Sequence, residues 1–303
     1  MKKISLILAA LVLFVCGCTA KQEPADKLSV VATVFPAYDF ARAVCGDDAT
    51  VSMLLEPGVE VHSFEPTAED IIKIENADLF IYTGGEGDVW VERILKSIGN
   101  PDLNVIKMVD ESALIHTHHD HNHGHSHEGA DEHVWLSPDN AKSIVSAICG
   151  AVSGLDPENA DRYQKRAGDY CAEITLLASE TKEIIASAKH RTIAVADRFP
   201  LKYLCEYYSL EYTAAFDACD HLADADAKTV MRLIDTVKKE GLSHVFYIEN
   251  GSGYLADTVC EATGAEKLML NSMHTVSHED FCSGLTYLDI MEHNKTVLER
   301  GLN

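Results

Sequence analysis

The chain alternates short apolar runs with amphipathic helical segments, and it does so in both halves. In the first half, the runs LSVVATVF, ATVSMLL, DLFIYT and NVIKMV each precede a helical pattern. In the second half, RTIAVA, EYTAAF, HVFYI and KLML repeat the arrangement. Alternating strands and helices predict parallel sheets that are covered by helices and connected by right-handed crossovers. We therefore expect an α/β fold with two lobes and a cleft between them.

A long polar segment, residues 156–189, separates the two halves. Asp156 is a suitable N-cap, and Pro157 suits the first helical position. At 1.5 Å per residue, a helix of about 30 residues spans about 45 Å, which is longer than one lobe needs. We expect one rigid helix to join an N-terminal lobe (residues 28–155) to a C-terminal lobe (residues 190–303).

Several helix boundaries can be predicted from capping residues. Thr67, followed three residues later by Asp70, is close to a capping box. Ser137 and Pro138 supply an N-cap and a first helical residue for the segment that follows them. The last helix is expected to run from about 279 to 300.

The N-terminus begins MKK and continues with the apolar run ISLILAALVLFV, a pattern typical of a secretory signal. The run has about a dozen residues, whereas a membrane-spanning helix needs about 20. Residues 1–17 are therefore predicted to be a signal peptide. Because the sequence VCGC resembles the lipobox of bacterial lipoproteins, Cys18 is expected to be acylated, and residues 18–27 to form a tether outside the cell membrane. Ordinary cleavage that leaves Cys18 as a free thiol is the alternative.

Charge and cysteine content limit the functional classes. The chain has 48 acidic and 25 basic residues, so its surface repels nucleic acid and attracts cations. Seven cysteines follow Cys18, none of them in a CxxC pair, and we expect most to be free thiols; pairing of Cys205 with Cys219 is not supported by spacing alone.

Residues able to bind metal follow five of the predicted strands: His62, His133, Asp197, Glu249 and His274. Ligands of open α/β sheets lie at the carboxyl ends of the strands, so these side chains are expected to line the cleft. Imidazoles together with carboxylates suit zinc or a neighbouring divalent metal.

Four motifs are similar to those of the metal-binding lipoproteins that serve bacterial ABC importers of zinc and manganese. They are EPGVEVHSFEPTAEDI, DEHVWLSPDNA preceded by a His-rich insert, FYIENGSGYLADTVCEATGA, and TYLDIMEHNKTVLERGL. The resemblance covers about residues 30–300. It implies two α/β lobes joined by a rigid helix, one metal ion between them, and a permease as partner. We expect the protein to be a monomer.

The resemblance assigns metal ligands at two positions directly. His62 matches the histidine of the HSFEP motif, and His133 matches that of HVWLSP. The family's third ligand falls in the segment ADRFPLKYL, which has no histidine and offers Asp197 and Arg198. Arg198 cannot bind a cation, because its guanidinium group stays protonated.

The family's fourth position reads Asn271 here, with His274 three residues further on. We therefore predict that His274 replaces the missing imidazole. Asp197 and Glu249 are expected to be either ligands or hydrogen-bond acceptors that orient a ligand.

Residues 116–132 are predicted to form a His-rich loop with no apolar periodicity. Polar tracts of this composition bind metal through many flexible imidazoles. We expect weak auxiliary metal binding by seven histidines of this loop: His116, His118, His119, His121, His123, His125 and His127. A spacer with no role in transport is the alternative.

The predicted function is high-affinity capture of Zn2+ outside the cytoplasm and its delivery to an ABC transporter permease. A manganese- or iron-binding member of the same family is the main alternative. Surface adhesins and metal-dependent hydrolases are further alternatives, since three protein ligands plus water also describe a catalytic zinc site. However, the sequence has no HExxH, GxSxG or GxxxxGK motif, so we do not expect an enzyme.

Overall fold

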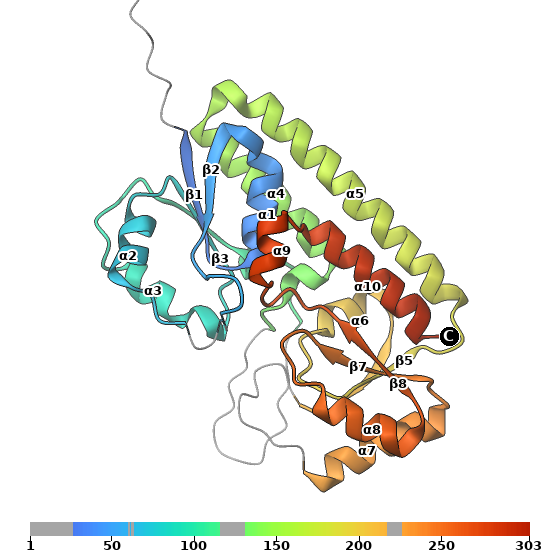
Figure 1. Cartoon of the computed structure of the whole chain (residues 1–303). Coiled ribbons are helices and arrows are strands. Elements are labelled where there is room, and N and C mark those ends of the chain that lie inside the picture. The colour runs from blue at the N-terminus through green and yellow to red at the C-terminus, as the bar shows by residue number, and fades with distance from the viewer. Residues whose placement is uncertain (1–26, 60, 62–63, 116–130, 217–225) are drawn as a thin grey trace, which may run out of the picture.

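The computed structural model describes residues 27–59, 61, 64–115, 131–216 and 226–303 (Figure 1). The predictions for the signal peptide, Cys18, His62 and the histidines from His116 to His127 fall outside these ranges. None of the described helices combines the length and apolar character that a membrane span requires.

The first sheet has four parallel strands in the order β2-β1-β3-β4. Its strands are β1 Leu28–Ala32, β2 Ala49–Met53, β3 Leu79–Tyr82 and β4 Asn104–Lys107. The associated helices are α1 Phe35–Cys45, α2 Ala68–Glu75, α3 Val89–Leu95 and α4 Pro138–Leu155. All four residues of β3 are buried, which is why this strand is continuously apolar rather than alternating.

The second sheet repeats this topology with the parallel order β6-β5-β7-β8. Its strands are β5 Thr192–Val195, β6 Glu211–Ala214, β7 His244–Ile248 and β8 Glu266–Leu270. Its half of the chain contains the helices α6 Lys202–Tyr208, α7 Ala227–Glu240, α8 Tyr254–Thr263, α9 His278–Ser283 and α10 Tyr287–Gly301. The predicted two-lobed parallel α/β fold is therefore confirmed.

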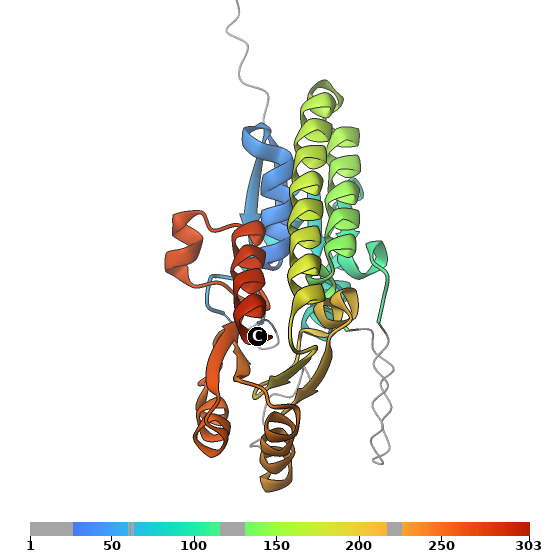
Figure 2. The same ribbon diagram turned by 90° about the vertical axis from the view of Figure 1, so that its right-hand side faces the viewer.

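Helix α5, Ala160–Ser187, runs along both lobes (Figures 1 and 2). Its 28 residues correspond to about 42 Å. The helix begins at Ala160 rather than at the predicted Pro157, because residues 157–159 form a short 3-10 turn. Asp156 instead accepts hydrogen bonds from the Tyr163 hydroxyl and the Asn159 side chain, each at 2.7 Å.

Two of the predicted helix starts are confirmed in detail. The Thr67 hydroxyl accepts from the Asp70 backbone N–H at 3.2 Å, while the Asp70 carboxylate accepts from the Thr67 N–H at 2.9 Å. The Ser137 hydroxyl accepts from the Asn140 N–H at 3.4 Å and caps α4.

The final helix was expected to be continuous, but it is divided into α9 and α10. Gly284 ends α9 with φ at 82°, a left-handed conformation that glycine adopts without steric cost. Thr286 then starts α10 with a capping box of its own. The break allows α10 to turn back and pack against α5 and α1, so that the last helix of the chain contributes to the N-terminal core (Figure 2).

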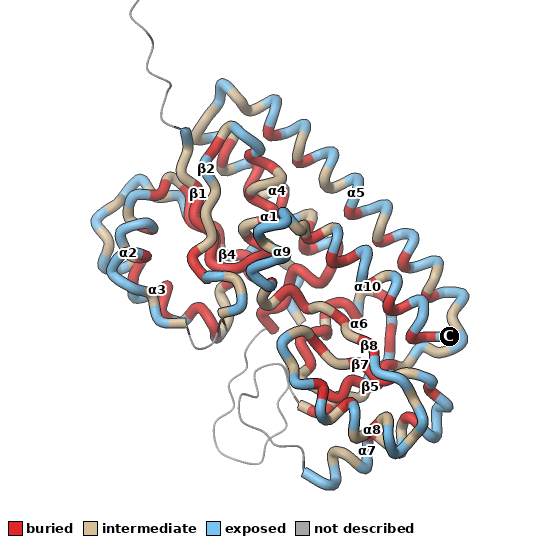
Figure 3. The backbone as a smooth tube through the Cα atoms, in the orientation of Figure 1, coloured by how far each residue is buried: buried red, intermediate tan, exposed pale blue. Residues whose placement is uncertain are grey.

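One continuous core extends from the first sheet through α4, α5 and α10 to the second sheet. A smaller core lies between the second sheet and helices α7 and α8. Figure 3 shows the buried positions gathered on the strands and on the inner faces of the long helices. Six of the cysteines lie in the described ranges, and all six are free thiols, including the buried Cys205.

Candidate metal centre

Two segments at the carboxyl ends of the two sheets meet between the lobes. One is the 3-10 turn η5, Val134–Leu136, which directly follows His133. The other follows β8 and carries His274. The Trp135 indole N–H donates to the Ser272 carbonyl at 2.8 Å, and this hydrogen bond joins the two segments.

His133 is fully buried and is held by a neighbouring carboxylate. Asp131 Oδ1 accepts the His133 backbone N–H and the ring Nδ1–H, each at 2.9 Å. The Nδ1 atom therefore carries the proton, and the lone pair of Nε2 points away from Asp131. Burial acts to lower the pKa of His133, but the Asp131 carboxylate outweighs it and raises this pKa.

The His274 backbone is positioned by the carboxylate of Glu249. This group accepts from the Ser272 N–H at 2.7 Å, from the Ser272 hydroxyl at 2.6 Å, and from the His274 N–H at 3.1 Å. Burial raises the pKa of Glu249, and these hydrogen bonds oppose that rise. In this structure Glu249 therefore orients the chain that carries His274.

Asn271 also shapes this turn. Its side-chain oxygen accepts from the Met273 N–H at 2.8 Å, and its backbone N–H donates to Asn294 at 2.9 Å. Met273 is buried and has φ at 59°, an uncommon conformation for a residue other than glycine. The amide oxygen of Asn271 is thus used within the turn that directs His274.

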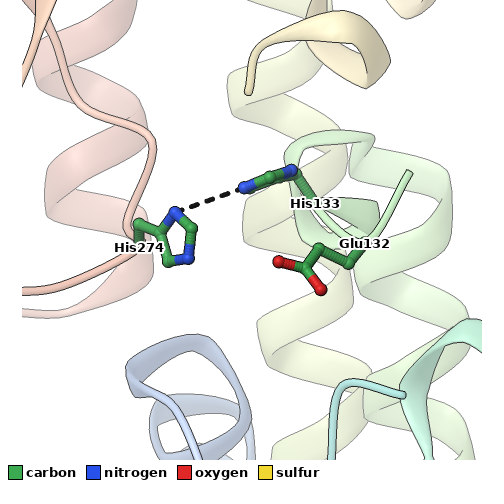
Figure 4. Close-up of side chains that lie close together, drawn as sticks. All are labelled: Glu132, His133 and His274. Carbon is green, nitrogen blue, oxygen red and sulfur yellow. Dashed lines mark hydrogen bonds between the residues drawn. The ribbon is translucent and has the colours of Figure 1, made fainter. Parts of the chain in front are cut away.

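The two imidazoles approach each other closely (Figure 4). The distance from His133 Nε2 to His274 Nδ1 is 3.3 Å, and the rings are nearly perpendicular at 77°. In a tetrahedral zinc site with Zn–N bonds of about 2.0–2.1 Å, two nitrogen ligands lie about 3.3–3.4 Å apart. The spacing of the two nitrogens therefore fits one edge of such a site.

Glu132 completes a group of three potential ligands with His133 and His274. Their ligand atoms lie within 4.8 Å of one another, and both Glu132 and His133 are buried. Glu132 was not among the metal ligands predicted from the sequence. The sequence signal for Glu132 was its position immediately before the predicted ligand His133. This signal is weak, because adjacent side chains commonly point in different directions.

The loop that precedes α3 holds Glu132 in place. Gly87 N–H donates to Glu132 Oε2 at 3.2 Å. A Cβ atom on Gly85 would lie 1.9 Å from the same oxygen, so only glycine permits this approach. Asp88 closes the loop by accepting from the Thr83 and Gly84 N–H groups at 2.7 and 3.1 Å, and burial raises its pKa to about 6.

Asp197 lies outside this group of three. Its carboxylate accepts from the Arg198 N–H at 2.8 Å and from the Ile248 N–H at 3.4 Å. Arg198 does reach the cleft, where it lines a small cavity together with Glu249 and His274. The described residues thus bring His133 and His274 together as predicted ligands, whereas Asp197 and Glu249 accept backbone hydrogen bonds.

Two parallel α/β lobes, one long connecting helix and a histidine-carboxylate group between the lobes define a two-lobed substrate-binding protein. The chain belongs to the ZnuA family, described as the periplasmic component A of zinc-uptake complexes, whose model matches residues 30–301. The resemblance to metal-binding proteins of ABC importers is therefore confirmed. This is a family of substrate-binding proteins rather than of enzymes.

Curated relatives support the assignment. The chain is 32% identical over 307 residues to the zinc-binding lipoprotein AdcA of Streptococcus pneumoniae serotype 4, covering 99% of this chain and 61% of that protein. It therefore spans about three fifths of the length of that relative. It is 30% identical over 308 residues to the high-affinity zinc uptake system protein ZnuA of Bacillus subtilis, covering 98% of this chain and 96% of that one.

Solved structures share the fold. The Zn(II)-bound ZnuA-like domain of S. pneumoniae AdcA aligns with a TM-score of 0.76 at 29% identity, covering 91% of this chain and 99% of that one. The metal-dependent lipoprotein YcdH of B. subtilis aligns with a TM-score of 0.78 at 28% identity, covering 91% and 99% of the two chains.

Proposed function

We propose that this protein captures Zn2+ between its lobes and delivers it to an ABC transporter permease. The observation that carries the proposal is the 3.3 Å separation of His133 Nε2 and His274 Nδ1 in the cleft. When a metal ion binds both nitrogens, it takes the place of the proton in the hydrogen bond between the two rings. The zinc-binding function of the relatives supports the choice of metal.

The proposed ligands are His133, His274 and Glu132, with His62 of the HSFEP motif as the fourth. Three imidazoles and one carboxylate suit tetrahedral zinc, whereas manganese favours more oxygen ligands. Asp197 and Glu249 are assigned to orienting the chain around the site, because both accept backbone hydrogen bonds.

Metal competition tests the proposal. Protein stripped of metal is titrated with zinc and with manganese, separately and in competition, by calorimetry. We expect one tight equivalent of zinc that manganese does not displace. His274→Ala should weaken zinc binding at least tenfold, a loss of about 1.4 kcal/mol or more, because it removes one of two nitrogens already placed at the zinc-ligand spacing.

The control for this titration is His293→Ala, which removes an exposed histidine of α10. It should bind zinc like the parent protein. If His274→Ala binds normally while Asp197→Ala does not, the ligand assignment is wrong. If manganese displaces zinc, the protein is a manganese-binding member of the family.

The seven histidines from His116 to His127 are assigned to metal recruitment rather than to the tight site. A tight site needs imidazoles that are fixed by packing and by hydrogen bonds, as His133 is. Deletion of residues 116–127 should remove several weak zinc equivalents in calorimetry and leave the tight one. Loss of the tight equivalent would show that one of these histidines is a ligand.

The protein is further assigned to the outer side of the cell membrane, where an acyl group on Cys18 anchors it. The lipobox-like sequence VCGC and the lipoprotein name of the pneumococcal relative support this assignment. In cells labelled with palmitate, Cys18→Ser should abolish the label and release the protein or leave it unprocessed. Membrane retention of the unaltered protein without any label would contradict the anchor.

A further inference from the structure

Asp131, the residue that orients His133, is itself held by residues from the other half of the chain. Its Oδ2 atom lies 3.9 Å from Lys202 Nζ, and its backbone carbonyl accepts from the Tyr203 hydroxyl at 2.9 Å. Lys202 and Tyr203 are the first two residues of α6, which follows β5 of the second sheet. The side chain of Asp131 is 2% exposed and that of Lys202 is 14% exposed, and Tyr203 is almost fully buried.

The Tyr203 hydroxyl makes a second hydrogen bond that fixes the backbone beside Asp131. It accepts from the Ile115 N–H at 3.2 Å while it donates to the Asp131 carbonyl. The Asp131 N–H in turn donates to the Ile115 carbonyl at 3.2 Å. One hydroxyl therefore holds together the two backbone positions that flank residues 116–130.

We propose that Lys202 and Tyr203 are positioning residues for metal binding, which act from the C-terminal half by holding Asp131 against His133. The inference rests on the proposed function, in which His133 Nε2 binds the metal. Asp131 can keep the proton on His133 Nδ1 only if its carboxylate stays in the plane of the imidazole ring and within hydrogen-bond distance of Nδ1. Lys202 directs the carboxylate, and Tyr203 fixes the backbone from which the carboxylate extends.

This arrangement makes the ligand of one lobe depend on a contact with the other. Residue 131 precedes His133 by two positions, so a shift of its backbone moves the ring as well as its hydrogen-bond partner. Helix α6 also packs directly against η5, which carries Trp135 beside the His133 ring. Movement of α6 away from this turn therefore loosens both supports of His133 at once.

The test uses the mature full-length chain with Tyr203→Phe and Lys202→Met. Each variant is expected to weaken zinc binding by about tenfold, because substituting a residue that orients a metal ligand typically lowers metal affinity by at least this much. In the metal-free protein, 15N NMR of the imidazoles should show His133 changing from the Nδ1–H tautomer to a mixture of tautomers. Lys202→Arg should restore both properties, because it keeps the positive charge.

Tyr207→Phe is the matched control, since Tyr207 lies on the same helix. Its hydroxyl makes no hydrogen bond to the residues that the structure describes. The inference is overturned if Tyr203→Phe and Lys202→Met bind zinc like the parent. It is also overturned if zinc affinity falls only in proportion to lost stability while the His133 tautomer stays unchanged. Normal zinc binding by His133→Ala would instead refute the proposed function itself.

Discussion

His133→Ala is expected to weaken zinc binding by at least about 100-fold, or about 2.7 kcal/mol. The ring is fully buried, its tautomer is fixed by Asp131, and its Nε2 atom lies at the zinc-ligand distance from His274. No described neighbour can replace this nitrogen, because Glu132 already belongs to the same group of ligands. Competition with a zinc chelator of known affinity measures the effect.

The same substitution should also reduce the stability of the metal-free protein. Burial acts to raise the pKa of Asp131, but its interactions with His133 lower it, so the carboxylate is charged and depends on that ring. Loss of the ring leaves a buried charge with fewer partners, at a cost of about 1–3 kcal/mol. Urea unfolding in the presence of chelator separates this cost from the lost affinity. Unchanged zinc affinity in folded His133→Ala would contradict the assignment of this ligand.

Trp135→Ala is expected to lower the free energy of unfolding by about 3–5 kcal/mol, the usual range for removing a large buried aromatic side chain. Trp135 is 1% exposed, packs edge-on against His133, and donates to the Ser272 carbonyl in the other lobe. Urea unfolding of the metal-free protein measures the loss.

Trp135→Phe separates the two contributions of this side chain. It keeps most of the apolar volume but removes the N–H donor, so the Ser272 carbonyl loses its partner, at a cost of about 1–3 kcal/mol. Because Ser272 lies two residues before His274, we also expect weaker zinc binding. If Trp135→Phe matches the parent in both measurements, the hydrogen bond between the lobes contributes little.

The fold was predictable because each strand and helix carries its signal locally. The fully buried β3 reads as a continuous apolar run, and the capping residues Thr67 and Ser137 mark the starts of α2 and α4. The break at Gly284 was missed because the polar pattern continues through it. A single glycine in such a pattern does not reveal whether the chain turns there.

The site was predictable only in part, because its geometry depends on contacts distant in sequence. The strand-end rule placed His133 and His274 in the cleft, and the structure brings their nitrogens together. The position of Glu132 depends on a hydrogen bond from Gly87, 45 residues away, and the role of Asp131 depends on Lys202. No local sequence pattern encodes either contact. Glu249 was predicted to be either a metal ligand or a hydrogen-bond acceptor that orients one, and its carboxylate accepts hydrogen bonds from Ser272 and His274.

The position of α10 has a consequence for the order in which the protein can assemble during synthesis. Tyr287 packs its ring against Phe40 at 4.9 Å, and its N–H donates to Asp39 at 2.9 Å. Arg42 reaches the Leu285 carbonyl at 2.8 Å in the same region. Helix α1, which starts at Phe35, is therefore covered by a helix that begins only at Tyr287. The N-terminal lobe can form its sheet early, but its core closes only after α10 has also been synthesised.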